Sequence, residues 1–136
     1  MPFESFANLR VRSYELDSYG HVNNAVYMQW LEHGRSRHLQ DKGFDYHAIT
    51  QAWGVRLVTV STKIDYRASL HLDDDVKVLT TVERIGRTSV TYKQAIFVRR
   101  DDQELVAADG SCTIVFTDAA MTTPMPVPVE FKALYA

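Results

Sequence analysis

Residues 17–39 read DSYGHVNNAVYMQWLEHGRSRHL, a turn-rich loop that runs directly into an amphipathic segment. Side chains recur in this segment at helical spacing, on a stripe made of Tyr27, Leu31, Gly34 and His38, with Trp30 beside it. We predict a helix over residues 24–42, begun by Asn23 or Asn24 as the N-cap and stopped at Gly43. Gly34 costs about 1 kcal/mol relative to Ala inside a helix, which indicates that the helix packs closely against a sheet.

The segments on either side of this helix are predicted to be strands. One covers residues 6–14, and four more follow GFDYHAITQAWG, with turns at Gly86-Arg87 and at RRDDQ (99–103). The first of the four, VRLVTVSTKIDYR, is expected to place on one face Val58, Val60, Ile64 and Tyr66. Hairpin-like links favour antiparallel pairing, and the Pro-broken tail is expected to finish in a short helix. The pattern therefore predicts an α+β fold in which one long helix covers one face of an antiparallel sheet.

Length and composition narrow the class of protein. The 136 residues fit one domain, and a net charge of -2 gives no general attraction to nucleic acid or an anionic membrane. The single cysteine excludes an internal disulfide and fits a reducing compartment. The N-terminus does not resemble a signal peptide, and no apolar run reaches the roughly 18 residues of a membrane span. We expect a cytoplasmic protein organised as one domain over residues 1–136.

The loop before the helix carries residues suited to acyl transfer. An ionised Asp17 is either a nucleophile toward an acyl carbon or a general base for water. The first N–H groups of a helix have no partner inside it, so the backbone near Asn24 can donate to a carbonyl oxygen that becomes negative. His21 could orient a thioester or relay a proton, and Gly20 lets the chain turn or a ligand approach.

The same loop has a simpler explanation. Asp and Asn are common in turns and at helix starts, where their side chains accept backbone N–H groups. A histidine in such a loop is more often a hydrogen-bonded surface residue than a catalyst. Residue types alone leave both interpretations open.

The motifs themselves resemble a known family. DSYGHVNNAVY, with VRSYELD before it and YMQWLEHGR after it, resembles the 4-hydroxybenzoyl-CoA thioesterase family of hotdog-fold proteins. The segment is most similar to the long-chain acyl-CoA thioesterase III branch, and it shares HVNN with plant acyl-ACP thioesterases. IDYRASL and ERIGRTSVTY also match positions in the family pattern, so the resemblance extends over residues 6–116.

The resemblance implies a hotdog fold, with a long central helix wrapped by an antiparallel sheet of five to six strands. It implies an enzyme that hydrolyses an acyl-CoA, fatty or aromatic, without a cofactor. Two subunits would join edge to edge in a homodimer or homotetramer, with sites at their interface. Joining the edges also removes an exposed edge strand.

Site residues are carried over position by position. Asp17 would be the catalytic carboxylate, the N–H of Asn24 would polarise the thioester carbonyl, and His21 would match a functional histidine of the acyl-ACP enzymes. Asn23 would fix the loop. Tyr19 stands where the acyl-ACP enzymes have Asn, which favours Asp17 with backbone help over an Asp-Asn-His scheme.

Three alternatives remain at this point. The substrate could be an acyl carrier protein thioester, or the chain could be a non-catalytic module that binds acyl thioesters. A hotdog hydratase or dehydratase is disfavoured, because neither an HFPG-like loop nor a D…N…H hydratase motif is seen.

Several other residues have side chains that could form a site. Cys112 alternates with apolar residues and is interpreted as a buried core thiol. HLDDDV lacks EF-hand spacing, and the histidines at 33 and 38 do not form H-E-x-x-H, so no metal is predicted. Arg67 and Arg87 are weak candidates for the phosphates of CoA, since guanidinium groups pair well with phosphate. Tyr27 could line an acyl channel or belong to the core.

Overall fold

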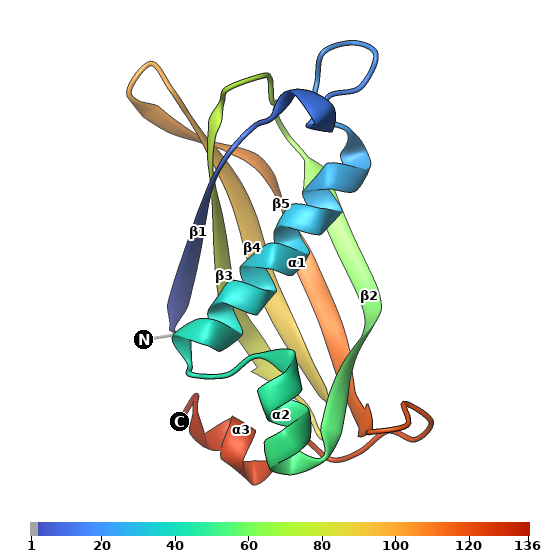
Figure 1. Ribbon diagram of the computed structural model, residues 1–136. Coiled ribbons are helices and arrows are strands. Elements are labelled where there is room, and N and C mark those ends of the chain that lie inside the picture. Colours follow the sequence, from blue (N-terminus) through green and yellow to red (C-terminus); the bar gives the residue numbers. More distant parts are fainter. Residues whose placement is uncertain (1–2) are drawn as a thin grey trace.

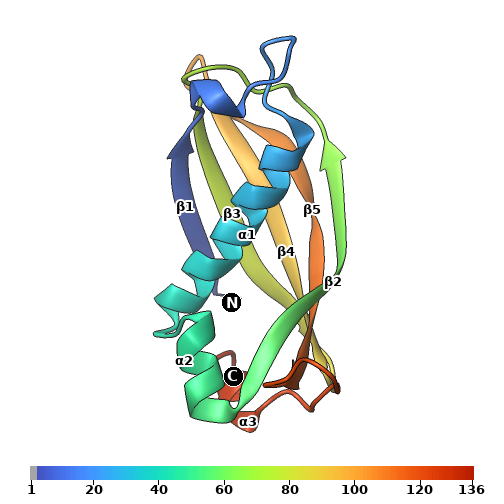
Figure 2. The same cartoon turned by 45° about the vertical axis from the view of Figure 1, so that its right-hand side comes forward.

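The computed structural model describes residues 3–136, and in it one long helix, α1, lies across one face of a curved sheet (Figures 1 and 2). All five strands pair antiparallel, in the order β1-β3-β4-β5-β2. The predicted α+β class is therefore confirmed. In chain order the elements are β1 Glu4–Arg10, a 3-10 turn η1 Ser13–Glu15, α1 Asn24–Asp41, α2 Tyr46–Trp53, β2 Val55–Tyr66, β3 Asp75–Ile85, β4 Ser89–Arg100, β5 Gln103–Asp118 and α3 Val129–Ala133.

The central helix begins and ends where the sequence predicts. The Asn23 side chain accepts the N–H of Ala25 at 2.9 Å, which makes Asn23 the N-cap, and Lys42 follows the last helical residue. One side of α1 is buried against the sheet; it consists of Val26, Tyr27, Trp30, Leu31, Gly34, Arg35, His38 and Leu39. None of the helices within residues 3–136 has both the length and the apolar composition to cross a bilayer.

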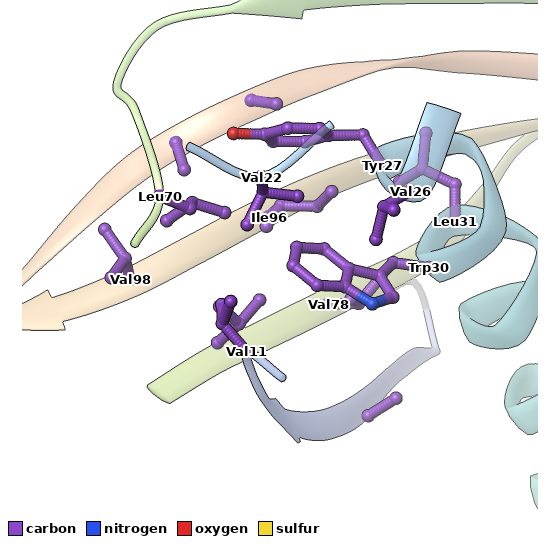
Figure 3. Packing of buried hydrophobic residues seen from close by; sticks show 14 residues of the cluster. Val11, Val22, Val26, Tyr27, Trp30, Leu31, Leu70, Val78, Ile96 and Val98 are labelled. Atoms are coloured by element: carbon purple, nitrogen blue, oxygen red, sulfur yellow. The ribbon is translucent and has the colours of Figure 1, made fainter. Parts of the chain in front are cut away.

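Two apolar clusters fill the space between α1 and the sheet. The first surrounds the N-terminal half of α1, where Tyr27 and Trp30 pack with Val11, Leu70 and Val78 (Figure 3). The second surrounds Leu39 and is closed by α2 and α3 at the opposite end of the sheet (Figure 1). The loop at residues 16–22 thus lies over the first cluster, far from α3.

Gly34 is the point of closest approach between α1 and the sheet. A Cβ added at Gly34 would lie 2.7 Å from Val78 Cγ1 and 2.9 Å from Thr80 Oγ1. The Nε2 of Gln94 donates both to Thr80 Oγ1 and to the carbonyl oxygen of Leu31, each at 2.9 Å, which fixes these neighbours. The predicted close packing at Gly34 is confirmed.

We expect Gly34→Ala to lower the free energy of unfolding by about 1–3 kcal/mol, because the added methyl group overpacks a rigid contact. At an exposed helical site the same change would stabilise by about 1 kcal/mol. Chemical denaturation of the wild type and Gly34→Ala measures the difference in their free energies of unfolding. Adding Val78→Ala to the variant removes the nearest methyl group and should make the double variant more stable than the sum of the two single changes. A stabilised Gly34→Ala protein would contradict this packing.

Two predictions about the strands were wrong. β2 carries a bulge between Thr59 and Ser61, which pair with Ile114 and Thr113 of β5. The extra residue, Val60, is 58% exposed, and it reverses the alternation of the strand. Val58 therefore lies on the opposite face from the Ile64 and Tyr66 side chains.

β1 is also displaced, since the observed strand covers Glu4–Arg10 rather than residues 6–14. The chain leaves the sheet at residue 11 because the backbone N–H and guanidinium of Arg12 bond the Glu15 carboxylate and close a 3-10 turn. The predicted turns at 86–87 and 99–103 and the closing short helix are confirmed.

Helix α2 was missed within GFDYHAITQAWG. Its boundaries nevertheless follow ordinary capping chemistry. The Asp45 side chain accepts the N–H of Ala48 at 2.7 Å, and Gly54 ends the helix with a φ of 69°.

Candidate active site

The loop that joins η1 to α1 is a tight hairpin. The N–H of Asn23 donates to the Glu15 carbonyl oxygen at 2.9 Å, and the N–H of Asp17 donates to the His21 carbonyl oxygen at 2.7 Å. Gly20 closes the turn with an N–H bond to the Asp17 carbonyl oxygen at 3.1 Å and a φ of 78°. Asp at the first position and Gly at the left-handed position suit such a turn. The sequence therefore dictates the shape of this loop.

The Asp17 carboxylate has one oxygen in the turn and one outside it. Its Oδ1 accepts the N–H groups of Tyr19 at 2.8 Å and of His21 at 3.1 Å. The other oxygen, Oδ2, accepts no hydrogen bond from residues 3–136, and the side chain is exposed. Asp17 can therefore both stabilise the turn and react with a ligand, because Oδ1 anchors the carboxylate and Oδ2 is not engaged in the turn.

The start of α1 faces the same space. The Asn23 side chain accepts the N–H of Ala25 and its carbonyl oxygen accepts the N–H of Val26. Within residues 3–136 the N–H of Asn24 is therefore the first helical donor without an acceptor. The Tyr66 hydroxyl donates to the Asn24 carbonyl oxygen at 3.4 Å.

An open cavity of about 300 Å³ joins these groups; it is lined by Asp17, His21, Val22, Asn24, Tyr27, Tyr66, Arg67, Ala68 and Ser69. The predicted carboxylate, histidine and helix start therefore lie in one place. Gly20 and Asn23 shape this place without lining it.

The two arginine candidates have different positions. Arg67 lines the cavity, but its guanidinium makes two hydrogen bonds to the Asp109 carboxylate, at 2.9 and 3.0 Å. Arg87 does not line the cavity. It lies in the β3–β4 turn, where its carbonyl oxygen accepts the N–H of Val127 near α3, at the opposite end of the sheet (Figure 1).

The chain is similar to known proteins in both sequence and fold. The model of the thioesterase-like superfamily matches residues 11–134. The chain belongs to this superfamily. It is 32% identical to the long-chain acyl-CoA thioesterase FadM of Escherichia coli over 124 residues, which are 91% of each chain. It is 30% identical to the acyl-acyl carrier protein thioesterase ATL2 of Arabidopsis thaliana over 93% of its own residues, and spans 65% of that plant protein.

The fold agrees with solved thioesterase-like structures. A crystal structure of a mutant 4-hydroxybenzoyl-CoA thioesterase bound to 4-hydroxybenzoyl-CoA superposes with a TM-score of 0.91 at 14% identity, covering 98% of this chain and 99% of the other. The expected hotdog fold and family are thereby confirmed, and the chain is a member of a family of thioester hydrolases.

In this thioesterase-like chain, a network of polar side chains lies next to His21, one of the residues that line the cavity. The His21 ring lies edge to face with the ring of His71, with centroids 5.1 Å apart. The N–H of His71 donates to Asp74 Oδ2 at 2.8 Å, and Arg100 donates to the same oxygen at 2.6 Å. Burial alone would raise the pKa of Asp74, but the hydrogen bonds from Arg100 and His71 lower it below the usual value. Asp74, an acidic residue of HLDDDV, is therefore paired with Arg100.

Tyr27 and Tyr66 form the aromatic wall of the cavity, with ring centroids 5.0 Å apart at 90°. Burial raises the pKa of Tyr27, and the neighbouring Tyr66 adds to this effect, so Tyr27 is a neutral phenol at neutral pH. Its ring belongs to the first apolar cluster and also lines the cavity, while its role in an acyl channel stays a prediction. Cys112 is buried in the second apolar cluster, as predicted.

Tyr66 and Glu15 also belong to this region, and neither was predicted as a site residue. The signal for Tyr66 was its position directly before Arg67 in IDYR. For Glu15 it was an acid two residues before Asp17, directly after the strand predicted over residues 6–14. Alternation alone assigned Tyr66 to a strand and assigned no role to Glu15.

Proposed function

We propose that the chain hydrolyses acyl-CoA thioesters, fatty or aromatic, in the cavity between the Asp17 turn and the start of α1. The observation that carries this proposal is that Asp17, whose Oδ2 accepts no hydrogen bond within residues 3–136, and the first helical residue Asn24 line the same cavity. Family membership supports the reaction class, and the relatives FadM and ATL2 bear the names of acyl-CoA and acyl carrier protein thioesterases.

The proposed chemistry follows from these positions. Asp17 Oδ2 either attacks the thioester carbon, giving a mixed anhydride that water cleaves, or removes a proton from an attacking water. In both routes the C–S bond breaks, the thiolate of CoA leaves and takes a proton, and the acyl group becomes a free acid. The Asn24 N–H donates to the oxygen as negative charge develops, a contribution of roughly 3–4 kcal/mol in comparable sites. His21 orients the thioester or relays the proton, and no cofactor is required.

We further propose that residues 1–136 act as one cytoplasmic hotdog domain in a homodimer or homotetramer. β2 is an edge strand of the sheet, and its exposed residues include Val60 and Tyr66. Such an edge favours pairing with a second copy. A partner at this edge would also cover the open cavity beside Tyr66, which would strengthen the electrostatic interactions inside it.

The test is release of free thiol from a panel of short, long and aromatic acyl-CoAs, with acyl carrier protein thioesters in parallel. Turnover on one acyl class supports the proposal and names the substrate. Turnover only on carrier protein thioesters supports the same chemistry with the other carrier. Binding without turnover on either carrier contradicts the proposed hydrolysis and supports a non-catalytic binding module.

Arg67 is proposed to contact a phosphate of CoA once it is released from Asp109. We expect Arg67→Ala to raise KM for acyl-CoA by about two- to fivefold and Asp109→Asn to lower it, both with little change in kcat, because exposed ion pairs are weak and exchange partners readily. Steady-state kinetics measure both. Arg37→Ala, which removes a similar exposed pair with Asp41 on α1, is the matched control. An unchanged KM in both Arg67→Ala and Asp109→Asn would exclude Arg67 from substrate binding.

A further inference from the structure

A buried carboxylate lies two residues before Asp17. Glu15 is 5% exposed. Its side chain accepts the backbone N–H of Arg12 at 2.8 Å and two guanidinium hydrogen bonds from Arg12, each at 3.1 Å. A fourth bond, also 3.1 Å, comes from the indole nitrogen of Trp30 in α1. A carboxylate with this many donors is held in a fixed position.

Glu15 remains ionised despite its burial. Burial alone would raise its pKa, but the hydrogen bonds from Arg12 and Trp30, together with the charge of Arg12, hold the pKa below the usual value. Glu15 is therefore ionised at neutral pH and can pair with Arg12 while it accepts the Trp30 N–H.

The contacts of Glu15 join both halves of the proposed site. Its side chain bonds Trp30, which is anchored in the first apolar cluster (Figure 3), while its backbone carbonyl oxygen accepts the N–H of the N-cap Asn23. The hairpin that carries Asp17 begins at this residue and ends at Asn23. Two attachments on α1, one at its start and one almost two turns along, therefore define where the hairpin stands relative to the helix.

We propose that Glu15 is a positioning residue, which holds the Asp17 carboxylate at a fixed distance from the Asn24 N–H by tying the hairpin to Trp30 and Asn23. Glu15 does not line the cavity, so it acts only through the residues that do. The inference rests on the proposed function for its catalytic consequence. Its structural half, the attachment of the hairpin, is independent of any activity.

The test compares Glu15→Gln with Glu32→Gln, a matched change at an exposed glutamate of α1. Amide hydrogen exchange by NMR reports the attachment, and kinetics on the preferred acyl-CoA report the catalytic effect. We expect Glu15→Gln to speed exchange at His21 and Asn23 by about tenfold and to lower kcat by about 10- to 100-fold with KM nearly unchanged. Glu32→Gln should change neither.

Two further variants keep the proposal falsifiable. Trp30→Phe keeps an aromatic ring and removes the indole N–H donor, at the cost of a small cavity in the first apolar cluster. It should reproduce part of both effects, and it provides the test even if Glu15→Gln does not fold. In an Asp17→Asn background, Glu15→Gln should have no additional effect on the residual rate, because the residue it positions is already inactive. A merely structural role would lower stability and leave kcat, measured well below the melting temperature, at the wild-type value.

The outcomes separate this inference from the proposed function. Unchanged exchange in both Glu15→Gln and Trp30→Phe overturns the positioning role whatever the activity. Faster exchange with unchanged kcat, or an equal loss of rate in the Asp17→Asn background, also overturns it. An absence of turnover in the wild type contradicts the proposed function and with it the catalytic half of this inference. The exchange measurement would still decide the structural half.

Discussion

Asp17→Asn is expected to lower kcat on the preferred acyl-CoA by about 10²–10⁴-fold, the usual contribution of a positioned acid or base, and to leave the melting temperature nearly unchanged. The fold should persist because an Asn side chain keeps the oxygen that accepts the N–H groups of Tyr19 and His21. The rate should fall because the second carboxylate oxygen is replaced by an NH₂ group, which neither attacks a thioester nor removes a proton. Thiol release and thermal unfolding, measured on the same preparation, check both halves.

Asp45→Asn is the matched control for this change. Asp45 is also exposed and also accepts a backbone N–H, that of Ala48, at the start of a helix. Its amide variant should retain both stability and turnover. If Asp17→Asn turned over acyl-CoA as fast as the wild type, the carboxylate would have only a turn-forming role and the proposed mechanism would be wrong.

The second large effect concerns the stability of the protein below neutral pH. His38 is completely buried, with its ring stacked on Tyr135 at a centroid distance of 5.6 Å and beside the rings of Phe3 and Tyr92. Burial, reinforced by the positive charge of Lys42, lowers the pKa of His38 from 6.5 to about 4. The folded protein therefore holds His38 neutral over a pH range in which the unfolded chain binds a proton.

The direction of the pH effect follows from proton binding. Between pH 6.5 and 4 the unfolded state carries more protons than the folded state, so the free energy of unfolding falls as the pH is lowered through this range. The stabilisation is fully present above pH 6.5, and up to roughly 3 kcal/mol is lost by pH 4. We expect His38→Phe, which keeps a buried ring and removes the proton site, to lose less stability over the same interval by about this amount.

The comparison must be made as a difference between two proteins, because Glu15 and Asp74 also have lowered pKa values and lose stabilisation in acid. Urea unfolding at a series of pH values gives the free energy of unfolding of the wild type and of His38→Phe, and the difference between them is compared. His33→Gln changes an exposed histidine of the same helix and should follow the wild type. Parallel pH curves for wild type and His38→Phe would contradict a neutral buried His38.

The long helix α1 and the Asp17–Gly20 turn were predictable because interactions between residues close in sequence determine them. The stripe from Tyr27 to His38, the Asn23 cap and the glycine at 34 each act within α1 or at one contact with the sheet. The Asp17–Gly20 turn is likewise determined by four consecutive residues, because the Asp17 side chain accepts a backbone N–H and Gly20 adopts a left-handed conformation. The resemblance to the hotdog family was carried by these same residues.

The remaining differences depend on interactions that alternation does not show. The bulge at Val60 depends on pairing between β2 and β5, and it reversed the predicted faces of one strand. Glu15 and Trp30 are 15 residues apart in sequence and meet only after the hairpin folds back on α1. Arg67 could be chosen as a candidate from its charge, but its pairing with Asp109 of β5 could not be predicted.

The most direct test of the central claim is the position of the thioester in a crystal structure of Asp17→Asn bound to the acyl-CoA that the wild type hydrolyses. We expect a carbonyl oxygen within about 3 Å of the Asn24 nitrogen, with the thioester carbon beside the side chain of residue 17. A thioester bound elsewhere, for example in the hollow on the outer face of the sheet beside Lys63 and Lys93, would contradict it.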